Sequence, residues 1–341
     1  MRIAIIGAGG FVGGWVAEEL AGGSSHEPLA YVRRWSSAQR VARRGIALRL
    51  ADTTMDFAGI DAIVNASLPL ADEPMVLRDL YGRAAKAGVR RFVHLSSAAV
   101  YGDLEGALDE TIAPRPNDDY ARGKRAGELE LLRLAGAGGP EAVILRPSII
   151  YGPFSEPWTI RYAKRITAGK WLGLGAAGDG TCNLIHARDV VRAVVAAIEA
   201  PTLSGPLVLN INGPDLPSWN DYIRLFGDAL GTEGRRTPSA ASLAVATSSA
   251  RLTRTAGRLV KKYAGGLLAA VTASSAGAKS MVQGAKGIAN LYPDEGELRL
   301  LRRRAVYDGT LAADAIGYRP AVSLAAGLQE SVAWLRRHGI V

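Results

Sequence analysis

The chain has 341 residues, of which 48% are hydrophobic and 21% charged, so it can bury a sizeable core as one large or two moderate globular domains. A single cysteine, Cys182, excludes an internal disulfide, and no apolar run is long enough to span a bilayer. The net charge of +9 comes from residues 231–304, which hold 13 basic and 4 acidic residues, while the rest of the chain is balanced. Because a lone cysteine suits a reducing compartment and no signal-peptide pattern precedes the first predicted strand, we expect a cytoplasmic protein.

The start of the chain predicts a phosphate-binding turn. Residues 3–6 form an apolar run typical of a strand buried on both faces of a parallel sheet, and an apolar helical pattern follows from Val16. Between them, Gly7 would allow a tight turn, Gly10 would let the backbone approach a pyrophosphate, and Gly13 would let the helix lie close to the strand. The helix N-terminus would offer free N–H groups to the phosphates of a dinucleotide. An ordinary glycine turn is the alternative.

The second predicted strand, residues 28–34, ends in Arg33 and Arg34. Proteins that bind NAD usually place an acidic residue in this region, about 20 residues past the glycines, to hold the ribose 2′-hydroxyl. Two guanidinium groups would instead attract the 2′-phosphate of NADP, unless they are only the solvated end of a strand. We therefore favour NADP as the cofactor, with NAD as the alternative.

Polar residues follow the next two predicted strands. The third, residues 46–50, leads to Asp52, and the fourth ends in Asn65, Ala66 and Ser67. Because the carboxyl ends of strands line the ligand crevice of a doubly wound sheet, Asp52 is placed to meet the adenine and the other three to run beside the cofactor. Asp52 is equally suited to cap the following helix.

A serine, a tyrosine and a lysine follow the fifth predicted strand, residues 91–95. Ser97 comes directly after the strand, where its hydroxyl could bond a substrate carbonyl oxygen. Tyr120 and Lys124 are four residues apart, so on a helix they share one face. A phenol with a pKa of about 10 is a poor base at neutral pH, and a neighbouring ammonium would lower that pKa. The pair alone is more typical of a helix surface, but its position after a glycine loop and a Ser-Ser strand end is much rarer.

With these motifs the sequence resembles the extended short-chain dehydrogenase/reductase family, which includes the epimerase/dehydratase group. The resemblance covers nearly the whole chain, because further motifs follow in the family's order: Ser96-Ser97-Ala-Ala-Val-Tyr101-Gly102, Leu145-Arg146-Pro147, Tyr151-Gly152-Pro153, Asn183-Leu-Ile-His186-Ala-Arg-Asp189, Asn210-Ile-Asn-Gly213-Pro214 and Ile316-Gly317-Tyr318-Arg-Pro320. It implies an α/β fold, a Rossmann-type doubly wound parallel sheet with helices on both faces, plus a smaller mixed α/β C-terminal substrate lobe. We expect the NAD(P)-binding domain at residues 1–152, with 183–200 returning to the sheet, and an interleaved substrate lobe made mainly of 153–182 and 201–341.

The resemblance also implies roles. Tyr120 would transfer the proton at the reacting hydroxyl or carbonyl, Lys124 would bind the nicotinamide ribose and lower the tyrosine's pKa, and Ser97 would orient the substrate oxygen. His186 and Asp189 are expected mainly to pack and cap. The implied cofactor contacts are Gly7, Gly10, Phe11, Val12, Gly13, Arg33, Arg34, Asp52, Asn65, Ala66, Ser67, Leu95, Tyr120, Lys124, Pro147 and Ile150. The implied substrate contacts are Ser97, Ala98, Tyr151 and Asn183, and no metal site is expected.

Departures from the family pattern bear on the substrate. Dehydratase members carry an Asp-Glu pair where this chain has Ala98-Ala99, and alanines cannot move protons, which argues against 4,6-dehydration. Many nucleotide-sugar members have an asparagine in place of Ile149 and an arginine next to an aspartate in place of Cys182-Asn183. Those polar groups hold the diphosphate in such members, so their absence argues against a nucleotide-sugar substrate unless nearby basic residues substitute for them: Arg161, Lys164, Arg165 or Lys170. Residues 73–77 also replace the family's usual Asn-x-x-Gly-Thr.

The basic excess falls largely in and around a segment rich in Ala, Ser, Thr and Gly, residues 239–290. Its leucines recur at roughly helical spacing and its Arg and Lys residues lie largely off the apolar stripe, which predicts a helix. That helix would either cover the substrate cleft with a solvated charged face, which we favour, or rest on an anionic membrane as a peripheral contact. No recognition motif accompanies the charge, so we expect no nucleic-acid partner.

These observations favour an NAD(P)-dependent oxidoreductase of the extended short-chain type, which transfers hydride at a carbinol or carbonyl carbon of a small-molecule substrate with Tyr120 as acid and base. The alternative enzyme is an NAD(P)-dependent sugar or nucleotide-sugar epimerase that keeps and recycles its cofactor. From another class, a non-catalytic dinucleotide-binding regulatory protein would keep the fold, but it has no need of the Tyr120 and Lys124 pair. The resemblance further suggests a homodimer formed through a four-helix contact.

Overall fold

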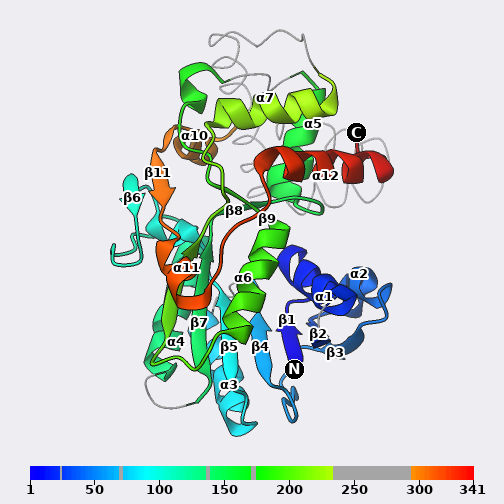
Figure 1. Ribbon diagram of the computed structural model, residues 1–341, viewed down its shortest axis with the longest axis vertical. Coiled ribbons are helices and arrows are strands. Elements are labelled where there is room, and N and C mark those ends of the chain that lie inside the picture. Colours follow the sequence, from blue (N-terminus) through cyan, green and yellow to red (C-terminus); the bar gives the residue numbers. More distant parts are fainter. Residues whose placement is uncertain (24, 69–71, 136–138, 170–173, 233–292) are drawn as a thin grey trace, which may run out of the picture. The chain divides into compact units, whose positions relative to one another are not determined.

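The computed structural model describes the chain except for residues 24, 69–71, 136–138, 170–173 and 233–292. It divides into two compact units, one made of residues 1–155, 183–216 and 305–327 and the other of 156–182, 217–304 and 328–341 (Figure 1). The two are interleaved along the chain, and the first unit takes in residues 201–216 and 305–327, which the sequence interpretation assigned to the substrate lobe. The predicted helix over 239–290 lies outside the described residues. Among the residues that are described, no helix is long and apolar enough to cross a bilayer.

The first unit is built on a parallel sheet of seven strands in the spatial order β10-β7-β5-β4-β1-β2-β3. Its strands are β1 (Arg2–Ile6), β2 (Glu27–Val32), β3 (Ala47–Leu50), β4 (Ala62–Asn65), β5 (Arg91–Leu95), β7 (Glu141–Pro147) and β10 (Leu207–Ile211). From β1 the chain first builds outward through β2 and β3, then returns to the other side of β1 with β4. Between β1 and β4 the strand order reverses, and ligands of such sheets bind outside the carboxyl ends of the strands at this point. The predicted doubly wound sheet is thus confirmed.

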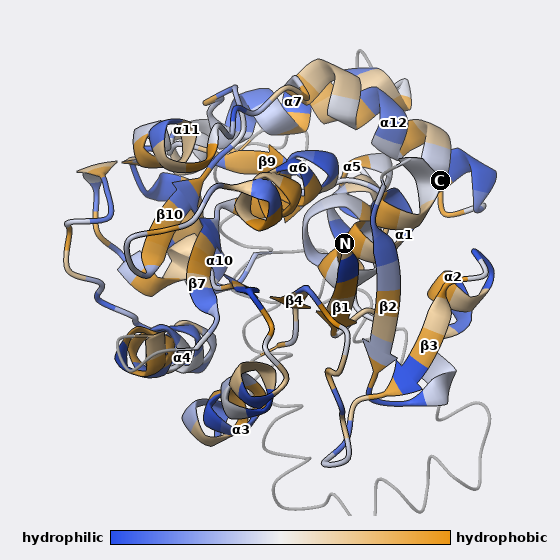
Figure 2. Ribbon diagram, turned by 60° about the horizontal axis from the view of Figure 1, so that its bottom comes forward, coloured by the Kyte–Doolittle hydropathy of each residue, from blue (hydrophilic) through white to orange (hydrophobic). Residues whose placement is uncertain are grey.

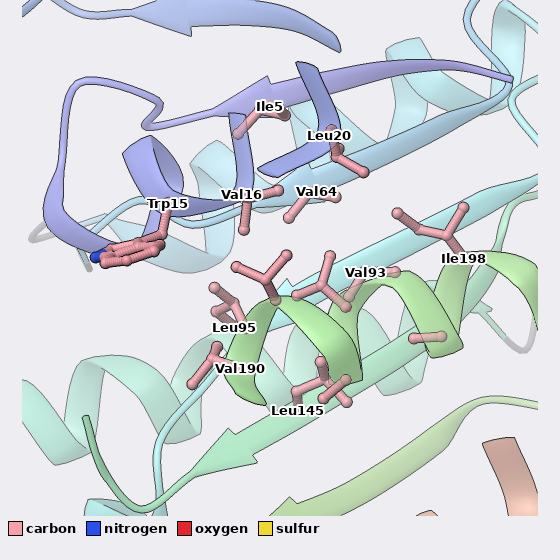
Figure 3. Packing of buried hydrophobic residues seen from close by; sticks show 14 of the residues in the cluster. Ile5, Trp15, Val16, Leu20, Val64, Val93, Leu95, Leu145, Val190 and Ile198 are labelled. Atoms are coloured by element: carbon pink, nitrogen blue, oxygen red, sulfur yellow. The ribbon is translucent and has the colours of Figure 1, made fainter. Parts of the chain in front are cut away.

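Helices cover both faces of the sheet because successive strand residues face opposite sides. Ile3 and Ile5 pack with residues of α1 and α6, whereas Ala4 and Ile6 pack with residues of α3 and α4. These helices are α1 (Phe11–Gly23), α3 (Glu73–Lys86), α4 (Asp119–Ala135) and α6 (Ala187–Glu199). Figure 3 shows the first of the two clusters, in which Ile5, Val64 and Val93 lie among side chains of α1 and α6. Burial on both faces explains why the strands are mainly apolar, as Figure 2 shows for β7 and β10.

Smaller elements complete the first unit. Two pairs of short strands are parallel, β6 (Gly106–Leu108) with β11 (Ala305–Tyr307) and β8 (Ile149–Tyr151) with β9 (Leu184–His186). A short helix, α2 (Gln39–Ala42), follows β2, and α11 (Thr310–Ile316) ends at Gly317 in the left-handed conformation. The turn after β5 is a 3-10 helix, Ala98–Tyr101.

The second unit has an aromatic core. Its elements are a π-helical turn (Glu156–Ile160), α5 (Arg161–Thr167), a 3-10 turn (Gly175–Gly178), α7 (Trp219–Leu230), α10 (Glu295–Arg302) and the C-terminal part of α12 (Leu324–Arg337). The rings of Trp158, Tyr162, Trp219 and Tyr222 pack against one another, with centroids about 6 Å apart. Ser218 begins α7 with a capping box, so this helix is specified locally as well as by its packing.

Candidate active site

The glycine turn between β1 and α1 forms a backbone cradle that side chains would fill. Gly7 has a positive φ of 84°, and a Cβ there would stand 2.9 Å from the amide nitrogen of Ser67. A Cβ on Gly13 would stand 2.8 Å from the carbonyl carbon of Gly7. Gly10 closes the turn by donating to the Gly7 carbonyl at 2.9 Å, and Phe11 begins α1 directly after it. The free N–H groups of α1 therefore open onto a surface made of backbone, which fits the pyrophosphate of a dinucleotide.

Two exposed arginines follow β2 beside this turn. Arg33 and Arg34 form no hydrogen bond or ion pair through their guanidinium groups in the part of the chain that the structure describes. The hydroxyl of Ser37 donates to the Arg34 carbonyl at 2.7 Å, and a Cβ on Gly9 would stand 2.7 Å from that same hydroxyl oxygen. The chain after Arg34 thus lies against the glycine turn, and two uncommitted positive charges stand close to it.

Asp52 closes a turn after β3. Its carboxylate accepts hydrogen bonds from the Thr54 amide at 2.8 Å and the Thr54 hydroxyl at 2.6 Å, and these bonds lower its pKa. The alternative that Asp52 caps the next helix is wrong, because a turn follows it and not a helix. A contact of Asp52 with an adenine stays a prediction.

The end of β4 is shaped by the buried side chain of Asn65. Its oxygen accepts from the hydroxyl of Ser67 at 2.7 Å and from the Ser67 amide at 3.2 Å, while its amide group lies 3.1 Å from Nδ1 of His94. Asn65 therefore acts on the site by holding the backbone of the loop. That backbone, at Ala66 and Ser67, is what lies against Gly7.

The structure brings Ser97, Tyr120 and Lys124 together at the carboxyl ends of β4 and β5. Ser97 caps the start of the 3-10 turn after β5, and its side chain lies close enough to that of Tyr120, in the first turn of α4, to lower the pKa of the phenol. Lys124 is only 3% exposed, and its ammonium donates to the carbonyl oxygens of Ser67 at 3.0 Å and Leu95 at 2.7 Å. Five residues predicted from three separate motifs thus form one cluster next to the glycine turn.

The pKa values of this cluster are set mainly by loss of solvent. Burial raises the pKa of Tyr120, although the bond from Ser97 works in the opposite direction, and the ring stays 40% exposed. Burial lowers the pKa of Lys124 to about 8, although Glu73 and Glu128 favour its charged form. The expectation that Lys124 makes the Tyr120 phenol acidic is not met in this structure, because desolvation dominates and Lys124 is not among the groups that shift the pKa of Tyr120. Tyr120 is consequently a protonated phenol at neutral pH.

A buried ion-pair network behind the cluster escaped sequence reasoning. Glu128 accepts two bonds from Arg146, both at 2.8 Å, and one from the hydroxyl of Ser96 at 2.6 Å. Arg146 also donates to the hydroxyl of Tyr101 at 2.9 Å. The network ties α4 to the ends of β5 and β7, so it fixes Lys124 against the Ser97 turn. Its one sequence signal was the position of Glu128, four residues after Lys124 and hence on the same helix face.

Two of the predicted substrate contacts are buried. Tyr151 is buried, with its ring edge-on to that of His186 at 5.1 Å. Asn183 is also buried, and its amide donates to the carbonyl oxygen of Ala305 at 2.9 Å. The Asn183 amide therefore joins the start of β9 to β11, and a contact of either residue with a substrate stays a prediction. Three further predicted contacts lie at the carboxyl end of the sheet. Ala98 is buried in the 3-10 turn after β5, Pro147 is the last residue of β7, and Ile150 is a partly buried residue of β8.

His186 and Asp189 cap and pack, as predicted. Nδ1 of His186 accepts from the Arg188 amide at 3.3 Å at the start of α6. The buried carboxylate of Asp189 accepts from the amides of Ala321 and Val322, each at 3.0 Å. In the described part of the chain, no group of His, Cys, Asp or Glu residues is arranged to hold a metal ion.

Comparison with known proteins agrees with this geometry. The model of the NAD dependent epimerase/dehydratase family matches residues 3–211, which include the glycine turn and the whole Ser97, Tyr120 and Lys124 cluster. A UDP-glucose 4-epimerase from Vibrio cholerae is 30% identical over 155 residues, or 45% of this chain, and the match spans 47% of that relative's length. An uncharacterized UDP-glucose epimerase, YtcB, from Bacillus subtilis (strain 168) is 25% identical over 262 residues, covering 68% of this chain and 83% of the relative.

Among solved structures, a UDP-glucuronic acid 4-epimerase from Bacillus cereus in complex with NAD shares the fold, with a TM-score of 0.72 and 18% identity over 99% of each chain. The family match covers more than half of the sequence and all of the sheet strands from β1 to β10. The chain therefore belongs to the NAD dependent epimerase/dehydratase family.

Proposed function

We propose that this protein is an NAD(P)-dependent oxidoreductase that reduces a carbonyl group, or oxidises the corresponding alcohol, on a small-molecule substrate. One observation carries the proposal: Ser97, Tyr120 and Lys124 meet at the carboxyl ends of β4 and β5, beside a backbone cradle that only glycines allow. A protein that only binds a dinucleotide needs the cradle but not the tyrosine and lysine.

The proposed cofactor is NADP, with NAD as the alternative. Gly7, Gly10 and the N-terminus of α1 would hold the pyrophosphate, and Arg33 and Arg34 would pair with the 2′-phosphate that distinguishes NADP. The solved neighbour from Bacillus cereus holds NAD, which supports the alternative. When bound, the nicotinamide supplies or accepts the hydride.

In carbonyl reduction Tyr120 is the proton donor. Its raised pKa keeps the phenol protonated at neutral pH, so a proton is available for the substrate oxygen as negative charge develops there. The hydroxyl of Ser97, which is anchored by the Ala99 amide at 3.1 Å, would hold that oxygen at hydrogen-bonding distance from Tyr120. Lys124 would bind the ribose through its ammonium, which two backbone carbonyls already orient.

A sugar epimerase is the second candidate, favoured by the names of both relatives above. It would use the same tyrosine for both proton transfers and keep its cofactor through the cycle. The residues Ile149 and Cys182 argue against a nucleotide-sugar substrate, because neither can bond a diphosphate.

The decisive experiment follows nicotinamide absorbance while purified protein and NADP are offered a panel of ketones and alcohols. We expect turnover that Tyr120→Phe lowers about a hundredfold or more, while Tyr81→Phe, which removes a hydroxyl that donates to the Pro140 carbonyl away from the site, leaves it unchanged. Interconversion of sugars without net change in absorbance would identify the epimerase. Cofactor binding that is equal in wild type and Tyr120→Phe, with no substrate in the panel, would favour the regulatory protein.

We further propose a cytoplasmic homodimer that forms through α3 and α4. These helices pack together and expose large apolar side chains, among them Met75, which is 62% exposed, and Leu129, which is 52% exposed. Light scattering of the purified protein measures the mass that tests this assembly, and a monomer would contradict it.

A further inference from the structure

A buried glutamate lies beside the proposed catalytic lysine. Glu73 is the first residue of α3 and is only 2% exposed, which is rare for a carboxylate. On α4, a Cβ placed on Gly127 would stand 3.3 Å from Cγ of Glu73 and 3.6 Å from Nε2 of His94. Gly127 is one helical turn from Lys124 and on the same face. The missing side chain at this position therefore leaves room for Glu73 beside Gly127, one helical turn from Lys124.

The ammonium of Lys124 needs a compensating charge in this place. The carbonyl oxygens of Ser67 and Leu95, which accept hydrogen bonds from the ammonium, are neutral, and burial disfavours the charged form. Of the groups that favour the ammonium, Glu73 contributes more than Glu128.

The other ionisable groups around Lys124 do less to balance its charge. Glu128, on the same helix, favours the ammonium less than Glu73 does, and it binds Arg146 at 2.8 Å and Arg125 at 2.9 Å. His94, from β5, is kept neutral because burial and the charge of Lys124 hold its pKa far below its usual range. Tyr120 is a neutral phenol. Glu73 on α3 is thus the carboxylate best placed to balance the lysine.

We propose that Glu73 is a positioning residue of the site, whose buried carboxylate is the counter-charge that keeps Lys124 in its ammonium form. The inference rests on the proposed function only for the catalytic importance of Lys124. A neutral amine would be a weaker donor to a ribose hydroxyl. Residues 73–77, which replace the family's usual Asn-x-x-Gly-Thr segment, would then supply this counter-charge through Glu73.

The test is the titration of Lys124, followed by NMR of isotope-labelled lysine side chains and assigned with Lys124→Met. We expect Glu73→Gln, which keeps the size but removes the charge, to lower the midpoint from about 8 by about one pH unit, a tenfold loss of proton affinity. Glu73→Asp restores the charge and should titrate like the wild type. Glu130→Gln is the matched control, because that carboxylate also joins α4 to α3 but pairs with Arg78 and Arg133.

Wild-type titration in Glu73→Gln, with only a loss of thermal stability, would overturn the inference and leave Glu73 as a favourable charge at the N-terminus of α3. Glu73→Asn offers the same readout from a second neutral variant should the glutamine variant not fold. The titration needs neither substrate nor cofactor, so it can succeed even where the search for turnover fails. If turnover is found, its alkaline limit should move to lower pH in Glu73→Gln by the same amount.

Discussion

Gly13 lies against the carbonyl group of Gly7 so closely that a Cβ on Gly13 would stand 2.8 Å from the carbonyl carbon and nearer still to the oxygen. This contact joins the first turn of α1 to the end of β1. Gly7 in turn abuts the amide of Ser67, whose carbonyl oxygen holds Lys124 at 3.0 Å. The cofactor cradle and the lysine of the proposed site are therefore linked through three residues of backbone, which cannot move aside for a side chain.

Gly13→Ala should consequently disrupt the cradle. We expect a destabilisation of about 1–3 kcal/mol and at least a tenfold loss of dinucleotide affinity, because the backbone of Gly7 must shift. Gly22→Ala is the control in the same helix, since a Cβ there would meet nothing within 4 Å, and it should stabilise the protein by about 0.5 kcal/mol. Calorimetric titration with NADP and urea unfolding measure both effects. Undiminished affinity in Gly13→Ala would mean that the turn can relax.

The buried ammonium of Lys124 predicts a pH dependence of stability. Its pKa in the folded protein, about 8, lies below the ordinary value of 10.5, so between these two pH values the unfolded chain holds a proton that the folded protein has released. The free energy of unfolding should therefore rise with pH in this window and gain nothing from Lys124 below it. Across the whole window, the free energy of unfolding should rise by about 3 kcal/mol more in the wild type than in Lys124→Met, which lacks the titrating group. Urea unfolding of the two proteins across the window gives the difference, which cancels the titration of all other groups. A difference that stays constant with pH would show that Lys124 is not desolvated.

The Glu128 and Arg146 pair should behave as a coupled buried unit. Glu128→Gln leaves Arg146 buried with its main counter-charge removed, and we expect a cost of about 3–5 kcal/mol. Glu128→Leu combined with Arg146→Met should recover much of that loss, because neither charge then remains in the core. Glu130→Gln, whose arginine partners are each 60% exposed, should cost about 1 kcal/mol or less. Additive effects of the single changes at 128 and 146 in a double-mutant cycle would contradict the coupling.

Much of the fold could be predicted because its signals are local. The apolar runs mark strands buried on both faces, and the spacing of Gly7, Gly10 and Gly13 marks the turn. The same holds for Tyr120 and Lys124, whose separation on one helix face is readable without a structure. These features depend on residues that are near one another in the chain.

The missed features depend on contacts between distant segments. Glu128 meets Arg146 and Ser96 from other elements, and nothing in the local sequence of each residue announces the pairing. The raised pKa of Tyr120 depends on how much solvent the folded chain removes, which spacing does not reveal. The bond from Asn183 to the carbonyl of Ala305, more than a hundred residues away, is likewise not readable from the sequence around either residue.

The arginines after β2 make cofactor choice testable by binding alone. Replacing Arg33 and Arg34 together by alanine should weaken NADP binding about tenfold or more while leaving NAD binding nearly unchanged, because only NADP carries the 2′-phosphate that the guanidinium groups would pair with. Arg43 and Arg44 are also exposed and directly follow α2. Replacing both by alanine removes the same amount of charge and is the matched control. Calorimetric titration with each dinucleotide gives the ratio of affinities. An equal loss for NADP in both double variants would reduce the effect to net charge, and an unchanged ratio in the Arg33 and Arg34 variant would leave NAD as the cofactor that the cradle accepts.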